Sequence, residues 1–304
     1  MMKEQSPQKR ATVVATITAT ILTIVKLTVG VMSGSVAVLA SAIDSLLDMA
    51  ISVFNFFAIK KSEETASDEY QYGKGKIQAI AGVIEGTVIT VSGLYIIYQA
   101  FEKLISHESV KLLTPSIIVM LFSLIVTYVL VRYLLRIARQ TDNIVIKADA
   151  LHYQTDLYSN AAVLVALVLV SATGYSAIDA IFGFAIGVYI IYSAYEIIVE
   201  GIAILLDRAL DGEVVASIGE IISNHTDVTG YHWLKTRTDG SINFVEFHLV
   251  LHPDMKLQEA HDISDEIEDQ IKKLVSKKVW LITPHYDPYD DEHINNSAIS
   301  EISN

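Results

Sequence analysis

Two pairs of ionisable side chains stand inside apolar stretches of the chain. Residues 35–59 carry Asp44 and Asp48, and residues 148–170 carry His152 and Asp156. Within each pair the residues are four positions apart, which places both side chains on one face of a helix. Three carboxylates and one imidazole are enough donors for one tetrahedral divalent metal ion. Because charge inside a bilayer is costly and is usually kept for a function, the two pairs predict an intramembrane metal site.

The types of ligand narrow the choice of metal. Carboxylate oxygen and imidazole nitrogen suit Zn²⁺, Fe²⁺, Mn²⁺ and Co²⁺ and argue against Cu⁺. The chain has no cysteine, so thiolate sites and disulfides are excluded. A purely structural role, in which polar side chains join helices or line a water pocket, fits one acid better than two matched pairs. Asn55 and Asn160 lie on roughly the same two faces, where they either support the ligands or join helices.

Composition and charge indicate a membrane protein with a soluble part. The chain has 304 residues, 52% of them hydrophobic, and its mean hydropathy of +0.41 is too high for an ordinary soluble protein. The net charge is −13, and the segment from Arg208 onward holds 18 acidic and 8 basic residues with seven of the nine histidines. Such a segment argues against nucleic acid and suits divalent cations. The polar start of the chain predicts no cleavable signal peptide.

Six apolar segments are long enough to cross a bilayer, which takes about 20 residues in a helix. They cover residues 11–31, 35–59, 77–101, 116–135, 148–170 and 177–206. Basic residues gather on one side of these segments, at Lys3, Lys9, Arg10, Lys60, Lys61, Lys74, Lys76, Arg132, Arg136, Arg139 and Lys147, whereas the other side has Lys103 and Lys111. Since basic connections stay in the cytoplasm, both termini are predicted there, in a multi-pass protein of the inner (plasma) membrane.

After residue 210 the pattern changes to that of a soluble domain. Helices are predicted over residues 213–224 and 257–275, and strands over 230–238, 242–251 and 279–283. The first two strands are joined at Asp239-Gly240, a hairpin signal. The order αββαβ predicts a small α+β sandwich. The predicted domains are a cytoplasmic tail (1–10), a six-helix transmembrane domain (11–208), a cytoplasmic domain (209–290) and a disordered tail (291–304).

The intramembrane ligands themselves suggest a transport mechanism. Without metal, three carboxylates leave the site anionic, and an imidazole exchanges its proton near neutral pH, so His152 is the natural proton switch. Metal binding needs a neutral imidazole and ionised acids, and it must therefore release protons. The sequence predicts a proton-coupled antiporter that works by alternating access.

Three other functions were weighed against transport. A membrane-bound metal sensor would keep the histidines of the soluble domain but would not need acids in the middle of the membrane. A channel requires ions to leave quickly, which tight coordination by four ligands opposes. The chain has no hydrolase or phosphoryl-transfer motif, so an enzyme is not expected. The sensor without transport is the alternative that stays open.

The segments SGSVAVLASAIDSLLDMAIS and ADALHYQTDLYSNAAVL, with YGKGK and LLDRAL, carry a resemblance. They resemble the cation diffusion facilitator family, in particular its bacterial YiiP-like zinc and ferrous-iron exporters. The resemblance covers nearly the whole chain. It implies a homodimer of six-helix protomers, each with a cytoplasmic ferredoxin-like domain. It also implies that Asp44, Asp48, His152 and Asp156 are the transport ligands, a set that goes with zinc, cadmium or ferrous iron.

The same resemblance implies a second metal site in the cytoplasmic domain. Its residues are His232, His248, His261, His285 and Asp287. The implied role is structural or regulatory, because bound metal would cancel the repulsion between two acidic domains and favour the dimer. The two remaining histidines before the tail, at positions 225 and 252, are predicted to be surface residues.

One metal site of the family is predicted to be lost here. YiiP-like members bind metal in the loop after the second span with one acid and two histidines, and the corresponding residues here are Ser67, Tyr70 and Lys74. A lysine is a cation and cannot be a ligand. Asp68 and Glu69 stay nearby, so the sequence leaves open whether any metal site is retained.

Two further predictions concern charges near the cytoplasmic side. The resemblance implies that Lys76 and Asp207 form an interlocking ion pair at the dimer interface, against the alternative of a lysine that reaches to the membrane surface and an ordinary acid at a helix end. Glu85 in the third span either faces the cavity and carries protons or lies in water near the cytoplasmic end, and the sequence favours the second slightly.

Overall fold

The computed structural model describes residues 6–33, 36–106, 114–173, 177–275 and 278–291. The chain divides into two compact units, Met1–Ile202 and Ala203–Asn304. The first unit is helical, and the second is a mixed α+β domain.

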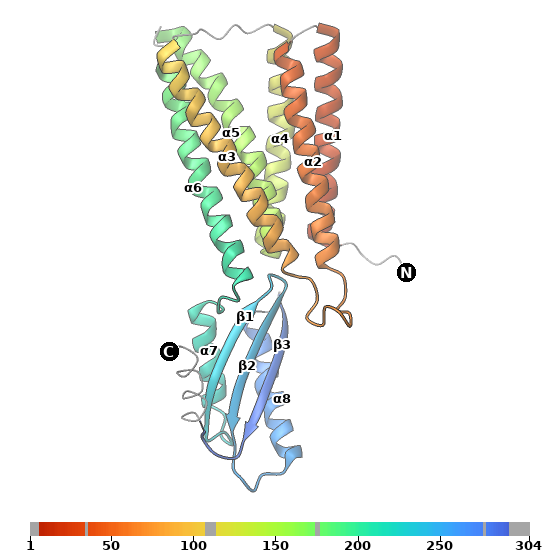
Figure 1. Cartoon of the computed structure of the whole chain (residues 1–304), viewed down its shortest axis with the longest axis vertical. Coiled ribbons are helices and arrows are strands. Elements are labelled where there is room, and N and C mark those ends of the chain that lie inside the picture. The colour runs from red at the N-terminus through yellow and green to blue at the C-terminus, as the bar shows by residue number, and fades with distance from the viewer. Residues whose placement is uncertain (1–5, 34–35, 107–113, 174–176, 276–277, 292–304) are drawn as a thin grey trace. The chain divides into compact units, whose positions relative to one another are not determined.

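The first unit consists of long helices that lie alongside one another (Figure 1). They are α1 (Pro7–Ser33), α2 (Val36–Ser62), α3 (Ile77–Ser106), α4 (Thr114–Thr141), α5 (Ile144–Thr173) and α6 (Ala177–Leu205). At 1.5 Å per residue each is about 40 Å long or more, which exceeds the roughly 30 Å hydrocarbon core of a bilayer. Within the described residues, α1, α3, α4 and α6 contain windows apolar enough to span a membrane. The predicted six-helix membrane fold is confirmed.

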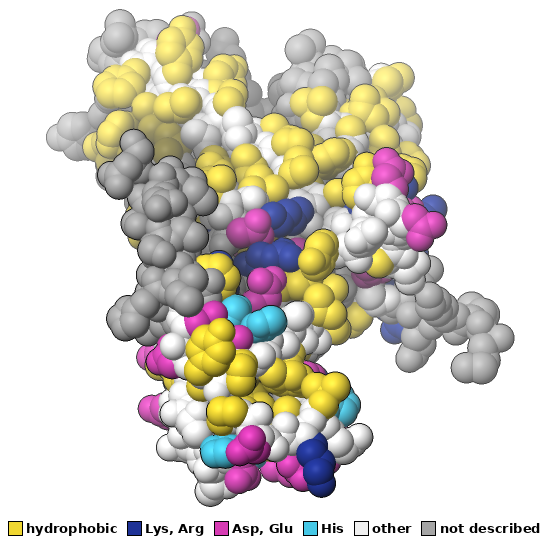
Figure 2. Space-filling view, turned by 60° about the horizontal axis from the view of Figure 1, so that its bottom comes forward, with side chains coloured by type: hydrophobic (Ala, Val, Ile, Leu, Met, Phe, Trp, Pro, Cys, Tyr) yellow, Lys and Arg dark blue, Asp and Glu magenta, His cyan; other side chains and the backbone are white. Residues whose placement is uncertain are grey.

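The side chains of this unit are arranged for an apolar solvent. Large apolar residues such as Ile24, Val91 and Ile125 are exposed, and the described face in Figure 2 shows many hydrophobic side chains on its helical part. Several threonine hydroxyl groups are satisfied within their own helix instead. In α1 the Oγ1 of Thr20 donates to the Thr16 carbonyl oxygen at 2.7 Å, so this hydroxyl needs no partner from lipid.

Helices α3 and α6 approach closely at glycines. A Cβ added at Gly187 would lie 2.5 Å from the Cγ1 of Ile97 and 3.0 Å from the carbonyl oxygen of Gly93. A Cβ at Gly93 would lie 2.8 Å from the Cγ1 of Ile191. Small residues at such crossings let two membrane helices make close van der Waals contact along their backbones.

Replacement of Gly187 by alanine is therefore expected to destabilise the helical unit. The new methyl group has to displace both Ile97 and a backbone oxygen, and overpacking of this kind costs about 1–3 kcal/mol. The measurement is the midpoint of thermal unfolding of the full chain in detergent. Gly212→Ala is the matched control, because a Cβ there has no neighbour within 4 Å. Equal midpoints for both variants would contradict this packing role.

The second unit has the predicted order αββαβ, with α7 (Gly212–Ser223), β1 (Gly230–Thr238), β2 (Ile242–Val250), α8 (Leu257–Leu274) and β3 (Val279–Asp287). The strands are ordered β1-β2-β3 in the sheet. Strand β1 is antiparallel to β2, and β3 is parallel to β2. Helices α7 and α8 lie along one side of the sheet (Figure 1).

Sequence periodicity explains this layer arrangement. Helix α8 buries Ile263, Ile267 and Ile271, which recur every four residues along one face. Strand β2 sends Phe247 and other alternate residues into the same core. The expected hairpin is present, with Gly240 at φ 96°.

Strand β3 is longer than predicted. It continues past residue 283 to Asp287 and includes Pro284. Proline cannot donate to a β-ladder, so the sequence suggested an end there. The strand continues because β3 lies at the edge of the sheet, where one side needs no hydrogen-bond partner. This extension carries His285 and Asp287 into the sheet.

Candidate metal centres

A chain of buried polar side chains fixes the start of α5 against α2 and α3. The Oδ1 of Asn143 accepts hydrogen bonds from the backbone N–H groups of Val145 at 3.0 Å and Ile146 at 3.2 Å, as an N-cap does. Its Nδ2 donates to the Oε1 of Gln78 at 2.9 Å, and the Nε2 of Gln78 donates to the Oγ of Ser62 at 2.7 Å. These hydrogen bonds thus link α5 to α3 and α3 to α2.

Helices α2 and α5 bring two of the predicted intramembrane ligands into contact. The Nε2 of His152 lies 3.0 Å from the Oδ1 of Asp48. One position further along α5 and four along α2, the hydroxyl groups of Tyr153 and Ser52 are 2.8 Å apart and buried. This second pair keeps the two faces in register. Two residues that the sequence assigned to one metal site thus contact each other across two helices.

Asp156 lies with Asp48 and His152 in a group of three side chains whose types can ligate a metal ion. One ligand atom from each lies within 4.8 Å of the others, a separation that a single ion can bridge. His152 is buried, and Asp48 and Asp156 are partly buried. The side chain of Asp44, the fourth predicted ligand, lies outside the described residues. Its role as a transport ligand stays a prediction.

A lysine inside α1 also reaches this region, and the sequence reading missed it. The Nζ of Lys26 donates a hydrogen bond to the Oγ of Ser45 at 2.7 Å, next to the position of Asp44 in α2. An intramembrane charge is itself a functional signal. Lys26 was missed because the sequence has no second ionisable residue four positions from it.

A second buried polar cluster lies next to the His152 group along α2 and α5. The Nδ2 of Asn55 donates to the Oε2 of Glu85 at 3.0 Å and to the Oδ1 of Asp149 at 3.3 Å. The slight preference for Glu85 in water is wrong, because this residue is only 2% exposed. Asp149 was missed, although it stands one helical turn before His152. The other candidate amide, Asn160, donates to the backbone oxygen of Asp156 at 2.7 Å.

In the second unit, three histidines stand side by side across the sheet. The register pairs His232 of β1 with His248 of β2, and His248 with His285 of β3. The ring centroids are 4.9 Å apart for the first pair and 4.6 Å for the second. Three residues distant in the chain thus form one row.

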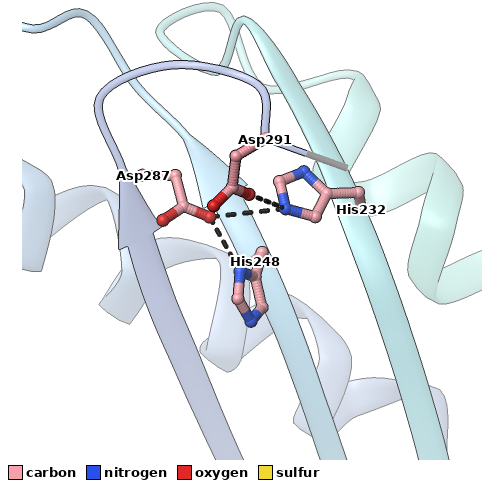
Figure 3. A group of neighbouring side chains, drawn as sticks. All are labelled: His232, His248, Asp287 and Asp291. Carbon is pink, nitrogen blue, oxygen red and sulfur yellow. Dashed lines mark hydrogen bonds and ion pairs between the residues drawn. The ribbon is translucent and has the colours of Figure 1, made fainter. Parts of the chain in front are cut away.

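Two carboxylates close over this row, as Figure 3 shows. The Oδ2 of Asp287 lies 2.7 Å from the Nδ1 of His248 and 3.4 Å from the Nε2 of His232. Asp291, in the segment after β3, places its Oδ1 3.0 Å from the same Nε2. His232, His248, Asp287 and Asp291 each offer a ligand atom within 4.8 Å of the others. Nitrogen and oxygen donors of this kind suit zinc and ferrous iron.

His232 is buried beside these two carboxylates. It is 5% exposed, and neither ring nitrogen makes a hydrogen bond to a described residue. A β-bulge between His232 and Lys235 shapes this place, with Trp233 at φ 58°. Such bulges redirect side chains, and a positive φ at a bulky residue is uncommon.

The remaining predicted ligands of this domain are outside the four-residue group. The Nε2 of His285 is 3.3 Å from the Oδ1 of Asp287, and the His285 side chain is 65% exposed. His261 is on α8, where its Nε2 is 3.6 Å from the Oδ2 of Asp265, and it is not part of the four-residue group. Asp291 was missed because the sequence assigned it to the tail.

The loop after α2 contains ion pairs. The Nζ of Lys74 lies 3.1 Å from the Oε2 of Glu64 and 4.7 Å from the ring centre of Tyr70. Lys61 and Lys74 together lower the pKa of the Glu64 carboxyl below its usual value. Neither described ligand group includes Asp68 or Glu69. Lys74 is thus paired with an acid and an aromatic ring of its own loop.

Asp207, one half of the predicted interlock, lies at the start of the second unit with φ 55°. Its Oδ1 is 3.5 Å from the Nη1 of Arg237. The predicted pair between Lys76 and Asp207 at the dimer interface stays a prediction.

Comparison with known proteins gives matches over both units. Residues 12–206 match the family model described as cation efflux transmembrane domain, and residues 210–289 match that of the cation efflux protein, cytoplasmic domain. A cation-efflux pump FieF of Citrobacter koseri is 34% identical over 279 residues, which cover 92% of each chain. The pump of the same name from Yersinia enterocolitica is 37% identical over 260 residues, 86% of each chain. That of Cronobacter sakazakii is 36% identical over 262 residues, 86% of this chain and 87% of its own.

Proposed function

Because this chain belongs to the cation efflux family, as its resemblance to the cation diffusion facilitators predicted, we propose that it exports Zn²⁺ or Fe²⁺ from the cytoplasm in exchange for protons. Cd²⁺ is proposed as a further substrate. The family is one of membrane transporters of cations. The choice of ions and the coupling to protons are the new content of this proposal.

The contact between Asp48 and His152 supports the proposal most directly. Their 3.0 Å approach, with Asp156 beside them, joins helices α2 and α5. A nitrogen and at least two carboxylate oxygens give a donor set that zinc and ferrous iron accept and that monovalent copper does not favour. With Asp44 as the fourth ligand the set becomes tetrahedral.

Coupling to protons follows from the same side chains. His152 binds metal only when its Nε2 carries no proton, and the carboxylates bind metal only when they are ionised. A metal ion and protons therefore compete for one set of atoms. If the site opens alternately to each side, metal leaves where protons enter, and His152 exchanges one of them.

The cytoplasmic metal group is proposed to regulate a homodimer. The second unit is a dimerisation-type cytoplasmic domain, and the segment after residue 207 carries a net charge of −10 from its 18 acidic and 8 basic residues. Metal at His232, His248, Asp287 and the adjacent carboxylates would reduce repulsion between two such domains. His261 and His285 would add further ligands, and Lys76 with Asp207 would hold the dimer near the membrane. Both termini are proposed to face the cytoplasm at the inner membrane.

The experiment that tests the function is metal uptake into proteoliposomes with an imposed pH gradient. Zn²⁺, Fe²⁺ and Cd²⁺ are expected to accumulate faster when the gradient drives protons outward, with Mn²⁺ slower because the site contains a nitrogen ligand. A proton ionophore should remove this difference. A metal flux that does not depend on the pH gradient would refute the proposal that the protein is a proton-coupled antiporter. If metal binds but none crosses the membrane, the protein is a sensor.

A further inference from the structure

The cluster of Glu85, Asn55 and Asp149 has no role in the metal site just described. Each residue comes from a different helix: α3, α2 and α5 respectively. Glu85 is 2% exposed, and Asn55 and Asp149 are completely buried. Two carboxyl groups enclosed in this way would be very costly if both were ionised and unpaired. The cluster therefore needs some positive partner.

The cluster has fewer hydrogen-bond donors than acceptors. The amide nitrogen of Asn55 has two hydrogens, and it gives one to Glu85 at 3.0 Å and one to Asp149 at 3.3 Å. Three buried oxygens are left without a partner among the described residues, namely Oδ1 of Asn55, Oε1 of Glu85 and Oδ2 of Asp149. All three are acceptors when the carboxyls are ionised. A proton on either carboxyl would turn one acceptor into a donor.

The charged groups around the cluster do not supply this donor. From α5 the nearest charged side chain is His152, whose Nε2 is taken by Asp48 of α2 at 3.0 Å. The Nζ of Lys147, also on α5, is held by Asp142 at 2.8 Å and by Glu200 of α6 at 2.7 Å. The local surplus is therefore negative, and a small cation is required.

We propose that the Glu85–Asp149 pair is a proton-binding site, separate from the metal ligands, which releases its proton when metal loads at Asp48 and His152. The released proton leaves a carboxyl oxygen as its O–H bond breaks, and water accepts it. This inference rests on the proposed metal site. It places one coupled proton on groups that never touch the metal.

The position of the cluster explains the coupling. Asn55 follows Asp48 by seven residues, two helical turns or about 10 Å along α2. Asp149 precedes His152 by one turn on α5. At such distances in a poorly polarisable interior, a divalent ion still repels a nearby proton appreciably. Metal arrival and proton departure are thus linked through space.

The test counts protons and metal ions together. Purified full-length protein in weak buffer is titrated with Zn²⁺ while a pH indicator reports protons released and a metal assay reports ions bound. Glu85→Gln, which keeps the size of the side chain but cannot ionise, is expected to bind the same number of ions and to release about one proton fewer per chain. Asp149→Asn provides the same comparison if Glu85→Gln folds poorly. Glu200→Gln is the matched control and should leave the proton count unchanged.

Combining variants links the lost proton to the transport site. With Asp48→Asn already present, Glu85→Gln should no longer change the number of protons released. Equal proton release by the wild type and Glu85→Gln would overturn the proton site and leave the metal site intact. One bound ion fewer in Glu85→Gln would also overturn it, because the cluster would then bind metal. Loss of Zn²⁺ binding by the wild type itself would overturn the proposed function and this inference together.

Discussion

Replacement of Asp48 by asparagine is expected to reduce pH-driven Zn²⁺ flux at least about 100-fold. Mutation of groups that only support a metal ligand already costs 10–100-fold in affinity, and Asp48 is proposed to be a ligand itself. It also makes the 3.0 Å contact that orients His152. Asparagine has almost the same shape, so the helices should pack as before. The measurement is initial Zn²⁺ uptake into proteoliposomes at matched protein content.

Asp142→Asn is the control for this experiment. Asp142 carries the same carboxylate, but its side chain is 66% exposed and its φ of 50° is one that asparagine tolerates. Lys147 keeps Glu200 as a partner at 2.7 Å. Flux should therefore stay near that of the wild type. Undiminished flux in Asp48→Asn would mean that the ion crosses without this ligand.

Replacement of His232 by alanine is expected to remove the stabilisation that Zn²⁺ gives to the cytoplasmic domain. An ion that binds only the folded state stabilises it by about 2.7 kcal/mol at a concentration 100 times its Kd. His232 supplies the buried nitrogen next to Asp287 and Asp291, so its loss should weaken binding strongly. The measurement is the thermal unfolding midpoint of the full chain with and without Zn²⁺.

Comparison within each variant separates metal binding from packing. Alanine also leaves a cavity, and the midpoint without metal records that cost. His252→Ala is the matched control, because His252 is 68% exposed and its nearest acid, Asp254, is 4.0 Å away. A Zn²⁺-induced shift that survives in His232→Ala would show that ions bind elsewhere in the chain.

Local spacing was enough to predict part of this molecule. The four-residue interval in α5 fixes one face of a helix wherever that helix packs, so the pairing of His152 with Asp156 needed no structure. Alternation and turn residues likewise located β1 and β2 almost to the residue. These features depend on neighbours in the sequence, which a single sequence displays.

Contacts between distant elements were beyond such reasoning. Glu85 is buried because α2 and α5 cover it, and a single sequence does not say which helices are neighbours. Asp291 belongs to the cytoplasmic metal group because of how the chain turns after β3. Spacing alone suggested that it lies in a tail. Likewise, His261 has the right chemistry but lies on α8, outside the group of four. In each case the three-dimensional arrangement determined whether the residue is buried or belongs to the metal group.

The parallel pairing of β2 with β3 has a consequence for the order of folding. The row of His232, His248 and His285 spans the whole sheet, and its last member docks only after α8 has crossed over. Contacts between distant segments form slowly. A chain that has made only the β1–β2 hairpin holds two histidines without Asp287, which is a poor ligand set. Tight metal capture by this domain would therefore serve as a checkpoint that is passed only when the final strand is in place.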